Sequence, residues 1–193
     1  MRVVVEGDSD EWAARRIVTY CGHEVTDLRA VGGKTKIDER LVKYSRAARR
    51  EPWVVFRDSD GECPVDLRNG LLDGVRTGEL FALRIACTMT EAWLMADRQG
   101  FAEYFHVSVD IVPNAPEELA HAKRALLGLC RRSRNRDIRE EVARDDHHPG
   151  PLFVPHLNRF ARTRWDVGAA ARNSPSLSRA VTAIAAMPRG AVS

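Results

Sequence analysis

Two short stretches of sequence decide the fold: RVVVEG at residues 2–7 and WVVFRDSDG at residues 53–61. Each stretch begins with a run of β-branched and aromatic side chains, which is typical of a strand buried on both faces of a parallel sheet. Each strand then runs into acidic residues followed by a glycine. The sequence therefore predicts two buried strands that carry carboxylates at their carboxyl ends.

The rest of the first half alternates strand and helix signals. Apolar residues recur at helical spacing from Trp12 to Cys21, and Gly22 ends that helix. Strands are expected at residues 2–5, 24–31, 53–56 and 80–87, and a basic helix at residues 37–50. This alternation predicts an α/β fold whose parallel sheet is flanked by helices and joined through right-handed crossovers.

The second half of the chain is expected to be mainly helical. Helices are expected at residues 91–98, 119–132 and 137–144 and, after a break at residues 145–151, near Leu157 to Trp165 and from Ser174 onward. We therefore expect residues 1–100 to form an α/β core. Residues 101–193 are expected to form a helical extension that packs on this core as one compact unit.

The composition is that of one globular domain. The chain has 193 residues, of which 44% are hydrophobic and 30% charged, so it is able to bury a core. Its four cysteines contain no C-x-x-C pair, which argues against a disulfide scaffold or a structural zinc site. No apolar run approaches the roughly 20 residues that cross a bilayer, and no signal-peptide pattern follows Met1. We expect a cytoplasmic protein without membrane contact.

The acidic residues at the strand ends indicate a metal site. In open parallel sheets, ligands bind beyond the carboxyl ends of the strands, where the strand order reverses. Glu6 ends the first strand and Asp58 the third, and Asp60 points to the same side as Asp58 if the chain is still extended. Crowded like charges raise one another's pKa and require a proton or a cation. A few oxygen ligands suit Mg²⁺ or Mn²⁺, which indicates metal-assisted phosphodiester chemistry.

Each acidic residue also has a purely structural interpretation. Acidic residues at strand-to-helix turns commonly cap helices, and for Asp58 or Asp60 taken singly this is the more common role. The joint pattern, Glu-Gly after one apolar strand and Asp-x-Asp after another, favours a metal site. This interpretation requires that the side chains of Glu6, Asp58 and Asp60 lie close enough to share one ion.

Together these motifs resemble the Toprim domains of topoisomerases, bacterial primases, overcoming-lysogenization-defect (OLD) nucleases and small ribonucleases. The resemblance is carried by VVEG at residues 4–7 and FRDSDG at residues 56–61. With GGK at 32–34, TEAWLMAD at 90–97 and SPSL at 174–177, nearly the whole chain is similar to a family of small, uncharacterised prokaryotic Toprim-like proteins. Members are often encoded beside ATPases related to the OLD proteins, which implies a partner ATPase and a role in defence against phages or mobile elements.

The resemblance implies a Toprim-like, Rossmann-like fold and a metal-dependent nuclease or nuclease subunit. It makes Glu6 the general acid or base and a possible metal ligand, while Asp58 and Asp60 hold Mg²⁺. Asp10 occupies the place of an acidic residue that helps OLD nucleases to bind a second metal ion. The alternative role of Asp10 is to stabilise the first turn of a helix.

Three further residues are candidates for the site. Glu91 follows the fourth strand and is either another acidic ligand or a solvated first-turn residue. OLD nucleases use a lysine near the scissile phosphate, and our candidate is Lys123, whose alternative is a solvated helix face. Lys34 follows two glycines near a helix start, a place that favours phosphate. A P-loop is excluded because Leu28 stands where its first glycine is required, so any ATPase is a partner chain.

Nucleic acid is the expected partner, with DNA favoured over RNA. The net charge of +3 permits a polyanionic partner without requiring one. A run of arginines is able to follow the phosphate backbone of a nucleic acid. In the alternative interpretation, these arginines lie on a solvated helix face and pair with nearby acidic residues. The members of the run are Arg131, Arg132, Arg134 and Arg136. Two rival functions stay open. One is a ribonuclease similar to the small Toprim maturase of ribosomal RNA, and the other is a noncatalytic subunit that binds nucleic acid or docks on an ATPase.

Overall fold

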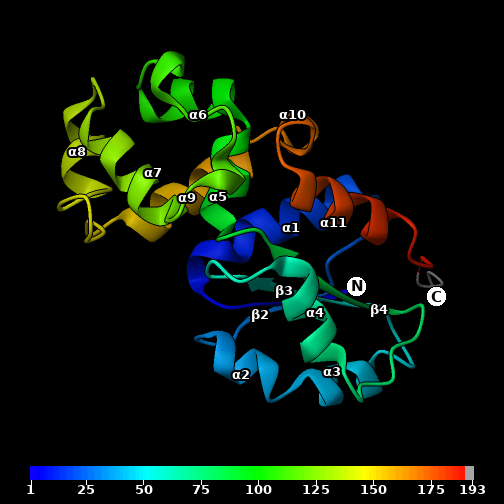
Figure 1. The fold of residues 1–193 in the computed structure, drawn as a ribbon. Coiled ribbons are helices and arrows are strands. Elements are labelled where there is room, and N and C mark those ends of the chain that lie inside the picture. The colour runs from blue at the N-terminus through cyan, green and yellow to red at the C-terminus, as the bar shows by residue number, and fades with distance from the viewer. Residues whose placement is uncertain (190–193) are drawn as a thin grey trace.

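A parallel sheet of four strands forms the centre of the computed structural model, which describes residues 1–189 (Figure 1). The strands are β1 (Arg2–Val5), β2 (Asp27–Ala30), β3 (Trp53–Asp58) and β4 (Phe81–Ala86). Their order across the sheet is β2-β1-β3-β4, and every neighbouring pair is parallel. The order therefore reverses between β1 and β3, and this places the expected ligand crevice at the carboxyl ends of those two strands.

Helices cover both faces of the sheet, because side chains on successive strand residues point to opposite faces. Val3 and Val5 enter one core, and Val4 enters the other. The first face is covered by α1 (Glu11–Tyr20), α5 (Thr90–Ala96) and α11 (Pro175–Ala185). The opposite face is covered by α2 (Lys34–Asp38), α3 (Leu41–Ala47) and α4 (Pro64–Leu72). The predicted α/β class with a helix-flanked parallel sheet is confirmed.

The remaining helices gather mainly at one end of the molecule (Figure 1). They are α6 (Arg98–Phe105), α7 (Ala122–Arg131), α8 (Arg136–Glu141), α9 (Phe153–Thr163) and α10 (Val167–Arg172), with short 3-10 turns η1 (Asp8–Asp10), η2 (Val109–Ile111) and η3 (Pro116–Glu118). Helix α9 packs on α1, while α10 packs on α5 and α11, so late segments of the chain return to the first half. Along residues 1–189, no helix is long and apolar enough to cross a membrane.

Several helix boundaries differ from those that the sequence predicts. The basic helix expected at residues 37–50 consists of α2 and α3, which meet at Arg40. Helix α6 has no counterpart in the sequence prediction. It begins because the backbone leaves the helical conformation at Asp97, whose carboxylate then accepts a hydrogen bond from the Gly100 amide at 3.1 Å. Such capping competes with continuation of the preceding helix, and apolar periodicity does not report it.

Gly150 is required where the loop between α8 and α9 folds back on α8. Its amide donates to the Val142 carbonyl at 2.9 Å, and a Cβ placed on it would lie 2.7 Å from the carbonyl carbon of Glu141. We predict that Gly150→Ala lowers the free energy of unfolding by about 2 kcal/mol, since the clashing atoms belong to backbone. Urea unfolding measures this change. Gly70→Ala in α4, where a Cβ meets no atom within 4 Å, is the control and should be neutral or stabilising. Equal midpoints for the two variants would contradict the prediction.

Candidate functional site

Glu6 and Asp58 meet at the switch point of the sheet. Glu6 directly follows β1, Asp58 ends β3, and the two strands are paired in parallel. The Glu6 carboxylate accepts a hydrogen bond from the Asp58 amide at 2.8 Å. The Glu6 carbonyl accepts two more from the amides of Gly32 and Gly33, at 2.8 and 2.9 Å. These hydrogen bonds connect the segment after β1 to the segment after β2 and to the end of β3. The acidic side chains of Glu6 and Asp58 therefore lie beside the switch point.

A pocket of about 320 Å³ opens at this place and brings further predicted residues together. Asp10 reaches it from η1, Glu91 from the first turn of α5 and Lys123 from α7. Asp10 and Glu91 are both buried. The lining residues are Glu6, Gly7, Ser9, Asp10, Gly32, Gly33, Asp58, Met89, Glu91 and Lys123. Four predicted acidic residues and the predicted lysine therefore share one pocket.

The carboxyl groups of this pocket destabilise one another's charged forms. Burial, followed by repulsion from Glu91, raises the pKa of Asp10 to about 7. Burial, and then the charges of Asp10 and Glu91, raise the pKa of Asp58 well above its ordinary value. Burial also raises the pKa of Glu6 and of Glu91. A cation in the pocket would oppose all of these effects because it favours the ionised carboxylates.

Lys123 brings positive charge to the same wall. Its ammonium lies 4.9 Å from the centroid of the Phe153 ring, which fixes the side chain by a cation–π contact. Its charge acts to lower the pKa of Asp10 and of Glu91, although burial outweighs that effect. The four carboxylates therefore exceed the charge of this one lysine.

Asp60 is not among the residues that line the pocket, although its charge acts to raise the pKa of Glu6 and of Glu91. Within residues 1–189, Glu6, Asp58 and Asp60 are not arranged to hold one ion, contrary to the expectation from the sequence. The chain leaves the extended conformation after β3, and Asp60 has a positive φ of 50°. Its carboxylate pairs with the Lys34 ammonium at 2.7 Å and lies 3.6 Å from a guanidinium nitrogen of Arg57. Asp60 and Lys34, both predicted as site residues, thus form an ion pair with each other outside the pocket.

Arg57 lies inside the FRDSDG motif but was not predicted as a site residue. It is only 4% exposed, and its guanidinium lies 3.7 Å from the Glu6 carboxylate and 3.3 Å from that of Asp38. It links the end of β3 to α2 and partly compensates the charge of Glu6. Its signal in the sequence is an arginine inside an apolar strand, because a buried charge requires a partner.

The predicted arginine run lies apart from the pocket residues. It spans the end of α7, a turn and the start of α8. Arg131 pairs with Asp146 at 3.2 Å and Arg136 with Glu140 at 2.7 Å, as in the solvated-face alternative. Arg132 and Arg134 are exposed. The run is therefore not one continuous helix face.

The donor chemistry of the pocket fits a divalent cation such as Mg²⁺ or Mn²⁺. All its acidic ligands are carboxylate oxygens, which these hard cations prefer. Within residues 1–189, no hydrogen bond reaches the second carboxylate oxygen of Glu6 or of Asp58. No three His, Cys, Asp or Glu side chains of the described chain are arranged to hold one ion. Mg²⁺ commonly takes only one or two protein carboxylates and completes its shell with water and phosphate.

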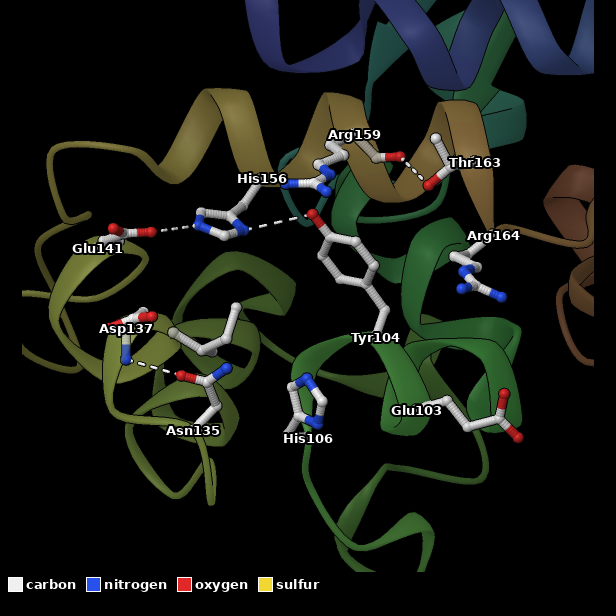
Figure 2. Close-up of a pocket in the computed structure, with 11 residues that line it drawn as sticks. Glu103, Tyr104, His106, Asn135, Asp137, Glu141, His156, Arg159, Thr163 and Arg164 are labelled. Atoms are coloured by element: carbon white, nitrogen blue, oxygen red, sulfur yellow. Dashed lines mark hydrogen bonds and ion pairs between the residues drawn. The ribbon is translucent and has the colours of Figure 1, made fainter.

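A larger cavity of about 640 Å³ lies between α6, α8 and α9 (Figure 2). His156 links two of its side chains: one ring nitrogen lies 2.7 Å from the Glu141 carboxylate, and the other 3.3 Å from the Tyr104 hydroxyl. The chain of hydrogen bonds joins the three helices, and it contains none of the residues predicted for the site.

Fold and site together define an α/β protein with an acidic pocket at the switch point of a parallel sheet. No family model matches the chain, and no solved structure matches it. The chain is similar to Uncharacterized protein YbjD of Escherichia coli (strain K12), with 27% identity over 169 residues. The match covers 84% of the chain and 30% of YbjD, so the chain spans less than a third of that relative's length.

Proposed function

We propose that this chain is a Mg²⁺- or Mn²⁺-dependent phosphodiesterase of Toprim type, acting on nucleic acid as a nuclease or a nuclease subunit. The observation that carries the proposal is the pocket itself, which Glu6, Asp10, Asp58 and Glu91 line together with Lys123. Its position is the one at which parallel α/β sheets bind ligands. The Toprim assignment and the role in phage defence come from the resemblance of the sequence motifs. These motifs do not distinguish DNA from RNA, and the preference for DNA is part of the proposal.

Glu6 and Asp58 would hold the principal cation, and Asp10 and Glu91 a second one. When bound, such a cation offsets the charge of a phosphate group and lowers the pKa of a water ligand. Asp60, held by Lys34, would support the site from outside the pocket.

The protein's own residues supply positioning, proton transfer and charge. Glu6 is fixed by the Asp58 amide and by Arg57, and its free oxygen is the candidate proton acceptor. Lys123, which reaches the same pocket, would stabilise the negative charge that develops on the phosphate. The burial of Arg57 keeps its guanidinium in place, which makes it a positioning residue for Glu6.

Metal binding should be visible without any substrate. We predict that saturating Mn²⁺, at about 100 times Kd, raises the melting temperature of the wild type by about 5 to 10 °C, because the ion binds only the folded protein. In Asp58→Asn the shift should be much smaller, since a carboxylate of the pocket is lost. Differential scanning fluorimetry measures both shifts. Equal shifts in the two proteins would place the ion elsewhere.

A partner ATPase is part of the proposal, and copurification from the native host tests it. Recovery of an ATPase with the chain would support the assembly. The two rival functions predict different results in a cleavage assay. A ribonuclease would cut RNA in preference to DNA, and a noncatalytic subunit would cut neither, even with its copurified partner.

A further inference from the structure

Three arginines surround a second small pocket at the edge of the sheet. Arg84 comes from the edge strand β4, Arg68 from α4 and Arg179 from α11. The pocket has a volume of about 290 Å³ and also contains Asn69 and Ser176. In the described chain, no acidic residue lines it. We call these three residues the arginine pocket.

Within residues 1–189, the guanidinium groups of the arginine pocket lack the carboxylate partners that Arg57 has. None of the three forms an ion pair within residues 1–189, although Arg84 donates to the Leu83 carbonyl at 2.6 Å. The Nε atom of Arg68 is buried and has no acceptor in the same range of residues. A buried donor without an acceptor carries a free-energy cost, which a bound ligand would remove.

The arginine pocket also brings like charges together, and the Glu117 carboxylate is nearby, where it accepts from the Ser176 hydroxyl at 2.7 Å. Burial and the charges of Arg68 and Arg179 lower the pKa of Arg84 to about 10. The pocket at the switch point, lined by Glu6, Asp10, Asp58 and Glu91, is called the carboxylate pocket below, and there the charges are reversed. Crowded cations require an anion, just as crowded carboxylates require a cation. The planar guanidinium fork matches phosphate oxygens in a bidentate way, and Asn69 adds an amide donor.

The two pockets lie on neighbouring strands. Arg84 is paired with Phe56 of β3, two residues before Asp58. With strand spacing near 4.8 Å and a rise near 3.3 Å per residue, the Cα atoms of Arg84 and Asp58 are about 8 Å apart. The Cys87 amide, just after β4, donates to the Ser176 hydroxyl at 3.2 Å and fixes the start of α11 there. A strand of nucleic acid is long enough to reach both pockets.

We propose that the arginine pocket binds a phosphate group. In the substrate, this is a backbone phosphate, and the scissile phosphate of the same strand lies at the carboxylate pocket. The assignment of the substrate rests on the proposed nuclease function. The phosphate chemistry does not, since it follows from the arginine pocket alone.

The test measures binding without metal, so that the carboxylate pocket does not contribute. Fluorescence anisotropy in EDTA compares a labelled single-stranded DNA 12-mer on wild type, Arg68→Gln and Arg179→Gln. We expect each variant to lose at least about fivefold in affinity and the slope of log K against log salt to fall by about 0.7, the loss of one phosphate contact. Arg172→Gln on α10, also an exposed arginine, is the matched control and should bind like the wild type.

Competition by a mononucleotide and by inorganic phosphate identifies the source of the phosphate. If only the 12-mer is affected by the substitutions, the ligand is a polynucleotide backbone. If the small phosphates bind as tightly as the 12-mer and show the same sensitivity, the arginine pocket binds phosphate but its ligand is a free metabolite. If none of the three probes distinguishes the variants from Arg172→Gln, the inference is overturned. The Mn²⁺ melting shift of Arg179→Gln should equal that of the wild type, so failure of this inference is distinguishable from failure of the metal site.

Discussion

Asp58→Asn is expected to lose nearly all metal-dependent cleavage, by about 1,000-fold or more. The substitution removes a carboxylate at the switch point but keeps the side-chain oxygen that accepts from the Thr90 amide at 3.0 Å. The fold should therefore survive while the charge that attracts the cation is reduced. A loss of 1,000-fold corresponds to about 4 kcal/mol of transition-state stabilisation, a magnitude found when one electrostatic group is removed from an active site.

The assay uses Mg²⁺ or Mn²⁺ with supercoiled DNA, linear DNA and RNA, both for the purified chain and for the complex copurified from its host. Glu6→Gln should show a similar loss. Asp66→Asn, an exposed aspartate on α4, is the matched control and should cut like the wild type. Residual cleavage that is identical in wild type, Glu6→Gln and Asp58→Asn would show that the nuclease activity does not arise from this pocket.

The place of Glu6 and Asp58 was predictable from the sequence for a physical reason. Parallel strands end at the same edge of a sheet, and both apolar strands are followed or ended there by a carboxylate. Asp60 was not predictable in the same way. Its position depends on a left-handed backbone conformation and on capture by Lys34, which lies 26 residues earlier in the chain.

The arginine pocket and Arg57 show where sequence reasoning ends. The three arginines of the pocket come from α4, β4 and α11, and no local spacing connects them. Arg57 stands inside the very motif that decides the fold, but its partners Glu6 and Asp38 lie on other elements. Charge compensation between distant segments is a property of packing, whereas periodicity reports only which face of an element is buried.

The carboxylate pocket should make the metal-free protein less stable than a neutral variant, and Asp10→Asn tests this. The pKa of Asp10 rises from an ordinary 3.8 to about 7 on folding. Above pH 4 the unfolded chain releases this proton while the folded protein retains it, so the contribution of Asp10 to stability is lost as pH rises toward 7. One pKa unit corresponds to about 1.4 kcal/mol. Asp10→Asn has no titrating group at this position, so its free energy of unfolding does not fall with pH for this reason.

In EDTA, the free energy of unfolding of Asp10→Asn relative to wild type should therefore increase by about 2 to 3 kcal/mol between pH 5 and pH 8. Urea unfolding at the two pH values measures it, and the difference between the proteins cancels the titration of groups that do not interact with Asp10. Asn is still able to accept from the Gly7 amide, which now donates to Asp10 at 3.0 Å. Asp8→Asn, an exposed neighbour in the same 3-10 turn, should show no such change. Saturating Mg²⁺ should narrow the gap because it stabilises the wild type, which keeps all four carboxylates, more than Asp10→Asn, which keeps three. A gap independent of both pH and metal would mean that these side chains do not oppose one another.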